Sequence, residues 1–187
     1  MSKYKAQKAQ RPKVEDIARE LLDEEKLANL LDFVEFLKAN KLTPQWYTTN
    51  SWTVKYKNKT VCVIKMNWMQ RPSDKENYWG IYHSHFSREE WFIDYHRYIK
   101  DKGLKEFILD NINPPYACSR KGGTVRCEGL PDMTILGRPF KSVCGCYSLV
   151  AKNPEGKTLE YAKELILFIK NYIFDLSTVD LAFEVVL

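Results

Sequence analysis

The sequence predicts one α+β domain in which an antiparallel sheet of about four strands packs against helices. Two observations support this prediction. Apolar residues recur at helical spacing near both ends of the chain, and between them lie segments in which β-branched and aromatic residues alternate with polar ones. Residues 113–147, here called the Cys-rich segment, interrupt this pattern with glycine, proline and cysteine, and predict a zinc-bound loop.

The composition is that of a single globular domain. The chain has 187 residues, of which 44% are hydrophobic and 28% charged, so residues 14–187 are expected to share one core. No stretch reaches the roughly 20 apolar residues that a membrane helix needs. The N-terminus also lacks the apolar centre of a secretory signal, so a cytoplasmic location is expected.

The net charge of +5 comes from the N-terminus. Five of the 29 basic residues lie in residues 1–13, which contain no acid, and the other 24 balance the 24 acidic residues. The body of the protein is therefore neutral and lacks the bulk positive charge that drives binding to nucleic acid. Residues 1–13 are predicted to form a basic, flexible tail.

Helical spacing begins at Val14 and continues to Asn40. Asp23 can cap a second helix within this stretch, so one bent helix or two are expected. Residues 42–50 contain Pro44 and a run of small polar residues, which favours a loop.

Three strands are expected between residues 51 and 85. The first two, at 51–57 and 60–68, are joined by a tight turn at Asn58-Lys59. A two-residue turn there pairs Tyr56 with Val61 and Val54 with Val63, which places all four on one face together with Trp52. The third strand, at 78–85, places Trp79, Ile81, His83 and His85 on one face.

The second half of the chain predicts helices around one more strand. Ser87 and Glu90 have the spacing of a capping box, which predicts a helix from about Arg88 to Gly103. Further elements are expected as a short helix at 104–112, a strand at 143–152, an amphipathic helix at 158–174 and a terminal strand at 179–187.

Four of the five cysteines fall in the Cys-rich segment. Structural zinc takes four tetrahedral ligands, favours thiolates and stabilises loops that cannot bury enough apolar surface. In a reducing compartment a cysteine cluster is better explained by metal binding or redox chemistry than by a disulfide framework. The predicted ligands of a structural zinc ion are Cys118, Cys127, Cys144 and Cys146.

Alternatives for these cysteines stay open. They can be unligated buried or redox-active thiols, or three of them can hold the metal with a histidine or water. In an extended strand Cys144 and Cys146 point to the same side, so both can reach one ion. Cys62 is expected to be an apolar filler.

The predicted sheet is dense in aromatic residues. The simplest interpretation is a core between the sheet and the helices. The alternative is an aromatic-lined pocket for a flat or cationic small molecule, because tryptophan faces attract both apolar and cationic groups. The residues predicted to line this ligand-binding site are Trp52, Tyr56, Trp68, Trp79 and Tyr82.

Two blocks of sequence carry a resemblance. The run Trp52-Thr-Val-Lys-Tyr-Lys-Asn-Lys, with Trp79-Gly-Ile-Tyr, resembles small bacterial domains related to gyrase-inhibitor-like effector-binding proteins. The run Thr134-Ile-Leu-Gly-Arg-Pro-Phe-Lys-Ser-Val-Cys, ahead of Asn153-Pro and Leu159-Glu-Tyr-Ala-Lys-Glu-Leu, is similar to hypothetical proteins with a cysteine-bearing C-terminal segment. The resemblance implies a ligand-binding module.

Three classes of function follow. The leading hypothesis is a small-molecule-binding domain with a structural zinc ion. The second is a zinc-stabilised module that contacts nucleic acid or an acidic partner through Arg120, Lys121, Arg126, Arg138 and Lys141. The third is a thiol- or metal-dependent enzyme that uses Cys144 and Cys146 or His83 and His85, although no phosphate loop, nucleophile elbow or HExxH motif indicates a particular reaction.

Overall fold

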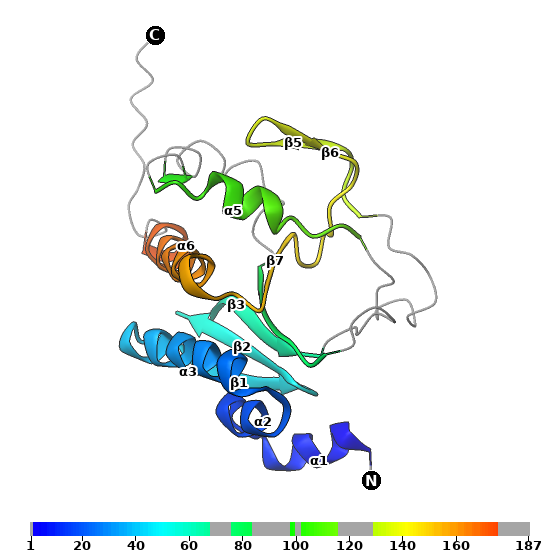
Figure 1. Ribbon diagram of the computed structural model, residues 1–187, viewed down its shortest axis with the longest axis vertical. Coiled ribbons are helices and arrows are strands. Elements are labelled where there is room, and N and C mark those ends of the chain that lie inside the picture. The colour runs from blue at the N-terminus through cyan, green and yellow to red at the C-terminus, as the bar shows by residue number, and fades with distance from the viewer. Residues whose placement is uncertain (1, 68–75, 84–97, 100–101, 116–128, 176–187) are drawn as a thin grey trace.

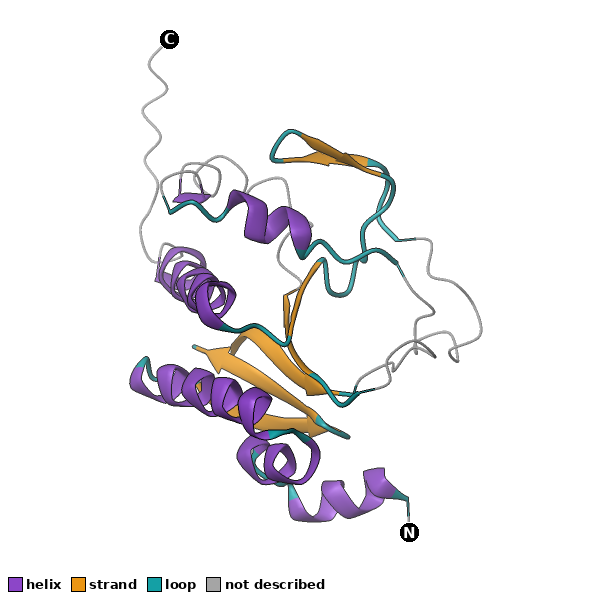
Figure 2. Ribbon diagram, viewed as in Figure 1, coloured by secondary structure: helices purple, strands orange, loops and turns teal. Residues whose placement is uncertain are grey.

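The computed structural model describes residues 2–67, 76–83, 98–99, 102–115 and 129–175 (Figure 1). They form an α+β fold with a five-stranded antiparallel sheet in the order β1-β2-β3-β4-β7. Figure 2 shows the long helices gathered on one side of these strands. The sheet has one strand more than the sequence predicts, because β1 forms where a loop was expected.

The apolar stretch from Val14 to Asn40 forms two helices. Helix α2 spans Val14–Leu21 and helix α3 spans Glu24–Ala39. Asp23 lies between them, and its Oδ1 accepts a hydrogen bond from the backbone N–H of Lys26 at 2.9 Å. This is the helix cap that the sequence predicts.

The basic N-terminus forms a helix, α1 (Lys3–Gln10), where a flexible tail was expected. The helix is attached to the sheet through Gln7, which is only 4% exposed. The Gln7 Nε2 donates to Asn50 Oδ1 at 2.8 Å, and the Asn50 backbone N–H donates to Gln7 Oε1 at 2.9 Å. Charge and composition could not predict this reciprocal pair, because Asn50 lies 43 residues from Gln7 along the chain.

Strand β1 (Thr43–Thr48) forms where a loop was expected at 42–50, so that prediction was wrong. It pairs with β2 (Ser51–Tyr56), and Pro44 lies opposite Val54. β1 lies at one edge of the sheet. Proline is tolerated in edge strands because its missing N–H can face away from the ladder.

The register of the β2–β3 hairpin differs from the prediction. Lys57 and Asn58 form the turn, both with positive φ, and a bulge follows Val54, so Val54 pairs with Cys62 and not with Val63. Tyr56 likewise pairs with Lys59 instead of Val61. The turn lies one residue earlier than predicted, and such a slip exchanges the faces.

Strand β3 spans Lys59–Met66, β4 spans Trp79–His83 and β7 spans Leu149–Lys152, shorter than the strand expected at 143–152. The amphipathic helix is confirmed as α6 (Gly156–Asp175) and the short helix as α5 (Lys105–Asp110). Within the Cys-rich segment, a hairpin of β5 (Met133–Ile135) and β6 (Arg138–Phe140) forms where irregular structure was expected.

Gly103 has a φ of +67°, and the N–H of Leu104 donates to the carbonyl of Ile99 at 2.9 Å, so a helix ends there as predicted. The capped start of that helix near Arg88 and the terminal strand expected at 179–187 lie outside the described residues.

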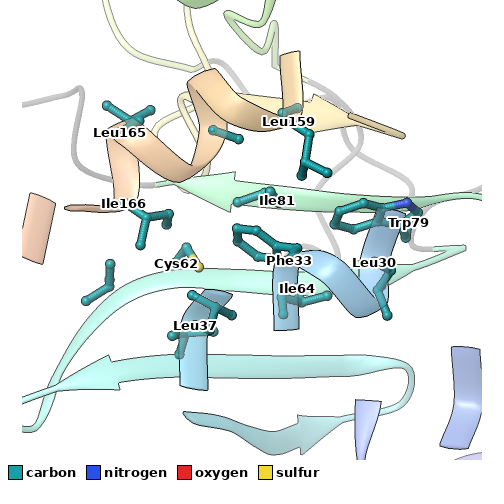
Figure 3. Close-up of a cluster of buried hydrophobic side chains, with 14 of the residues drawn as sticks. Leu30, Phe33, Leu37, Cys62, Ile64, Trp79, Ile81, Leu159, Leu165 and Ile166 are labelled. Carbon is teal, nitrogen blue, oxygen red and sulfur yellow. The ribbon is translucent and has the colours of Figure 1, made fainter. Parts of the chain in front are cut away.

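The core lies between the sheet and helices α3 and α6, which pack side by side on the same face (Figure 1). Figure 3 shows this layer, where Phe33 and Leu37 of α3 and Leu165 and Ile166 of α6 meet Ile81 and its neighbours in the sheet. Within the described residues, no helix is both long and apolar enough to cross a membrane.

Candidate functional site

Of the five aromatic residues predicted to line one pocket, the four that the structure describes do not share a face of the sheet. Trp52 and Trp79 lie in the main core and are fully buried. Tyr56 packs against the edge of this core, and Tyr82 points to the opposite face, because it lies three residues after Trp79 on the same strand. Trp68 lies outside the described residues. For Trp52 and Trp79, the core interpretation holds.

The two buried tryptophans differ at their indole nitrogens. The Trp52 Nε1 donates to the carbonyl of Pro12 at 2.8 Å. The Trp79 Nε1 is buried and has no acceptor in the described part of the chain. Figure 3 shows this nitrogen at the end of the ring that lies away from Phe33. Leaving a buried donor unpaired costs about 1–3 kcal/mol.

Trp79 also lines a cleft of about 690 Å³. The cleft lies where α3 and α6 begin, so residues from three distant parts of the chain meet there. Its other lining residues comprise five carboxylates, one ammonium group and two amides, namely Asp23, Glu24, Glu25, Glu76, Glu155, Lys26, Asn29 and Asn153. We call this feature the acidic cleft.

Asn153 fixes the position of Trp79 in the cleft. The backbone N–H of Trp79 donates to Asn153 Oδ1 at 3.0 Å, and the backbone N–H of Asn153 donates to the carbonyl of Trp79 at 2.9 Å. The ring itself lies against Phe33, with the ring centroids 5.9 Å apart. The unpaired indole N–H is therefore held in place by its own backbone and by the core.

The acidic cleft has a single cation among its lining residues, the ammonium group of Lys26. Its Nζ lies 2.7 Å from Asp23 Oδ2 and 3.2 Å from Glu76 Oε2. The hydrogen bond from the Lys26 side chain lowers the pKa of Asp23, and the hydrogen bonds to Asp23 and Glu76 raise the pKa of Lys26. Both groups are therefore charged at neutral pH, and the cleft as a whole is negative.

Part of this negative charge has an ordinary structural explanation, because carboxylates stabilise the N-terminus of a helix. Asp23, Glu24 and Glu25 lie in the cap and first turn of α3, where they offset the positive end of the helix dipole. That explanation does not extend to Glu76, which precedes β4, nor to the unpaired donor of Trp79. These two residues distinguish the acidic cleft from an ordinary helix start.

The opposite face of the sheet carries a second cluster of aromatic and basic residues. The Lys65 Nζ lies 5.1 Å from the ring centroid of Tyr82 and 4.0 Å from that of Tyr147, and the two rings pack edge to face. Lys65 is 4% exposed. These contacts are cation–π interactions, which stabilise a buried ammonium group.

Cys144 and Cys146 lie in a turn and not in the extended strand that was expected. The Cys144 Sγ accepts a hydrogen bond from the backbone N–H of Tyr147 at 3.5 Å. Asn113 holds this turn by accepting from the Cys144 N–H at 2.8 Å and donating to the Tyr147 carbonyl at 2.9 Å. We call residues 144–147 the cysteine turn.

The predicted four-cysteine zinc site is only half described. Cys118 and Cys127 lie outside the described residues, and within the described ranges no three His, Cys, Asp or Glu side chains are placed so that they could hold a metal ion together. Cys62 is buried in the core and burial raises the pKa of its thiol, as expected of an apolar filler.

The remaining candidates are only partly within the described residues. His83 is 1% exposed and shares the helix-facing side of β4 with Ile81, and His85 lies outside the described residues. Arg138 forms ion pairs with Glu106 at 3.2 Å and Asp110 at 3.6 Å, so α5 neutralises the charge expected to contact nucleic acid. Arg120, Lys121 and Arg126 also lie outside the described part.

The chain matches no protein-family model, no curated protein and no solved structure. The resemblance to effector-binding domains therefore stays a prediction, and function has to be inferred from the site alone.

Sequence reasoning found one member of the acidic cleft, Trp79, and missed the rest. The signals present were the acidic run that opens α3 and the Asn153-Pro-Glu-Gly turn before α6. Each is a common way to start a helix, and only the folded chain brings them together around one indole.

Proposed function

We propose that this chain is a small-molecule-binding domain whose ligand binds in the acidic cleft. The observation that carries the proposal is the buried indole N–H of Trp79, which has no acceptor within the described residues. Most buried donors in folded proteins are paired, so each exception calls for an explanation. A ligand that supplies an acceptor in the cleft would satisfy this donor.

The negative charge of the acidic cleft indicates the sign of the ligand's charge. Five carboxylates face one ammonium group, so a cationic molecule is attracted and an anion is repelled. A cationic ligand was also expected for the aromatic pocket. Here the carboxylates provide the attraction, because Trp79 lines the cleft but its ring is fully buried and offers no open face to a cation.

The test follows the indole signals of isotopically labelled protein in proton–nitrogen correlation spectra. The chain has 5 tryptophans, so each indole N–H can be assigned by substitution. During titration with small amines at constant ionic strength, we expect the Trp79 signal to move and the Trp52 signal to stay. Glu76→Gln should weaken the binding, whereas Glu20→Gln, at an exposed position on α2, should not. An unchanged Trp79 signal across a broad panel would rule out the proposal.

We also keep the structural zinc ion as a proposal, with Cys118, Cys127, Cys144 and Cys146 as its ligands. The cysteine turn supports it, because two of the four predicted ligands, Cys144 and Cys146, lie two positions apart in a turn that a hydrogen bond from the Tyr147 N–H to the Cys144 Sγ holds. A cytoplasmic location, which keeps these thiols reduced, is part of the same proposal. Elemental analysis of the purified protein tests for the metal.

A further inference from the structure

The acidic cleft already binds one primary ammonium group, that of Lys26. Asp23 and Glu76 accept hydrogen bonds from its Nζ at 2.7 and 3.2 Å. The two carboxylates come from separate elements, the cap of α3 and the segment before β4. Their spacing therefore suits a three-donor ammonium group held between two acceptors.

Lys26 can leave this position without unfolding the protein. The Lys26 side chain is 19% exposed, but its two partners are open to solvent, with Glu76 82% and Asp23 56% exposed, so the ion pairs contribute little to stability. The backbone N–H of Lys26 stays bonded to Asp23 Oδ1 whatever its side chain does. Its flexible four-carbon stem lets the ammonium group swing into solvent.

The unpaired indole N–H of Trp79 restricts which other functional groups the ligand can carry. An ammonium group has donors and no acceptor, so a ligand made only of amines cannot satisfy the indole N–H. A carboxylate or phosphate would accept from it but would be repelled by the surrounding acids. A hydroxyl group meets both demands, because it accepts from the indole and donates to a carboxylate.

We propose that the ligand is a hydroxylated primary amine of the amino-sugar class, whose ammonium group replaces that of Lys26 between Asp23 and Glu76 and whose hydroxyl accepts the Trp79 N–H. Lys26 is then an internal competitor that occupies the amine position when the cleft has no ligand. A cleft of about 690 Å³ is large enough for a sugar ring. This inference depends on the proposed function of the cleft.

The experiment compares three probes of similar ring size, namely D-glucosamine, D-glucose and cyclohexylamine. Each is titrated into the full chain at about pH 6, where the amines are protonated, and binding is followed by the Trp79 indole signal and by calorimetry. We expect glucosamine to bind at least about tenfold more tightly than either of the others, because only it offers both the charge and the acceptor.

Substitution of Lys26 tests the competition. Lys26→Met keeps most of the stem and removes the ammonium group, so glucosamine binding should tighten about threefold or more. Lys38→Met is the matched control, because Lys38 lies in the last turn of the same helix and pairs with Glu15 at 2.6 Å, away from the cleft. Weaker glucosamine binding by Lys26→Met would overturn the role of Lys26 as a competitor.

The outcomes separate this inference from the proposed function. If glucose moves the Trp79 signal as effectively as glucosamine, the cleft binds a ligand but the amine requirement is wrong. Equal binding of cyclohexylamine and glucosamine would remove the hydroxyl requirement in the same way. A Trp79 signal that none of the three probes moves would overturn the amino-sugar assignment and count against the cleft as a binding site.

Discussion

Trp52 and Trp79 are a natural pair for measuring what an unpaired indole costs. Both are fully buried in the same core, but only Trp52 has an acceptor, the carbonyl of Pro12. Phenylalanine at either position removes the same side-chain volume and the same N–H. The difference between the two variants therefore reports mainly on the hydrogen bond.

We expect Trp79→Phe to destabilise the protein by about 1 kcal/mol less than Trp52→Phe, because it removes a donor that was not satisfied. Urea unfolding of both variants, followed by circular dichroism, measures the difference. A larger loss for Trp79→Phe would show that its indole is paired in solution and would remove the main support for the ligand site.

Asp23 should make stability depend on acid pH. Its pKa lies below the ordinary value of 3.8, chiefly because of the hydrogen bonds from Lys26, so the folded state favours the charged carboxylate. This contribution is present when the pH is well above the ordinary pKa of 3.8 and is lost as the pH falls through the lowered pKa of the folded state. The group is exposed, so the effect is modest.

Asp23→Asn keeps a good helix cap and removes the titration. The melting temperature of this variant should therefore fall less steeply than that of the natural sequence as the pH decreases from about 4. Glu20→Gln serves as the control at an exposed position of α2 and should follow the natural sequence. Parallel curves for all three proteins would show that the Asp23–Lys26 pair is not formed in solution.

At the scale of elements, helix α1 depends on one buried polar side chain. Gln7 exchanges two hydrogen bonds with Asn50, which lies between β1 and β2 with a φ of +52°. Gln7 is the buried residue of this helix, and Tyr4 adds a ring contact with Trp46 of β1, with the centroids 6.3 Å apart. Loss of the Gln7 side chain leaves both groups of Asn50 without these partners.

Gln7→Ala should lower the free energy of unfolding by about 2 kcal/mol and speed amide exchange in residues 3–10. Gln10→Ala changes the same residue type at an exposed position of the same helix and is the control. Hydrogen exchange measured by mass spectrometry distinguishes the two. Equal exchange in both variants would mean that α1 is held by other contacts.

Helices α3 and α6 bring the acidic cleft together. They pack side by side, and the Lys163 Nζ of α6 pairs with Asp32 Oδ2 of α3 at 2.7 Å. Figure 3 shows that both run in the same direction along the core, so their N-terminal ends lie at the same end of the sheet, next to Trp79. The arrangement places two helix starts and their acidic residues around one cavity.

At the scale of the whole molecule, the proposed zinc ion should stabilise the Cys-rich segment. Among its described residues, Ile135 and Val143 form a small cluster with Leu109 of α5, separate from the main core. Because this cluster is small, an ion that joins the cysteine turn to another part of the segment would add much to the segment's stability.

Chelation should therefore lower the melting temperature, and Cys144→Ser should lower both the zinc content and the melting temperature. Cys62→Ala is the control, because it removes a buried thiol of the main core and should leave the zinc content unchanged. Metal analysis alongside differential scanning calorimetry measures both quantities. Protein that contains no zinc and is insensitive to chelators would remove this proposal.

Local interactions account for what could be predicted. The apolar repeat of α6 and the Asp23 cap of α3 each involve residues within a few positions of one another, so the sequence pattern predicts both. The same holds for the end of a helix at Gly103. In each case neighbours along the chain supply the stabilising contacts.

The remaining features depend on residues that are far apart in the chain. Strand β1 forms because β2 provides the backbone groups with which it pairs. Helix α1 is held by the hydrogen bond that the Gln7 side chain donates to Asn50 Oδ1. A bulge after Val54 sets the register between β2 and β3. The acidic cleft belongs to the same group. Composition and spacing single out Trp79 as a large buried ring, but whether its N–H meets an acceptor depends on the packing of three separate segments around it.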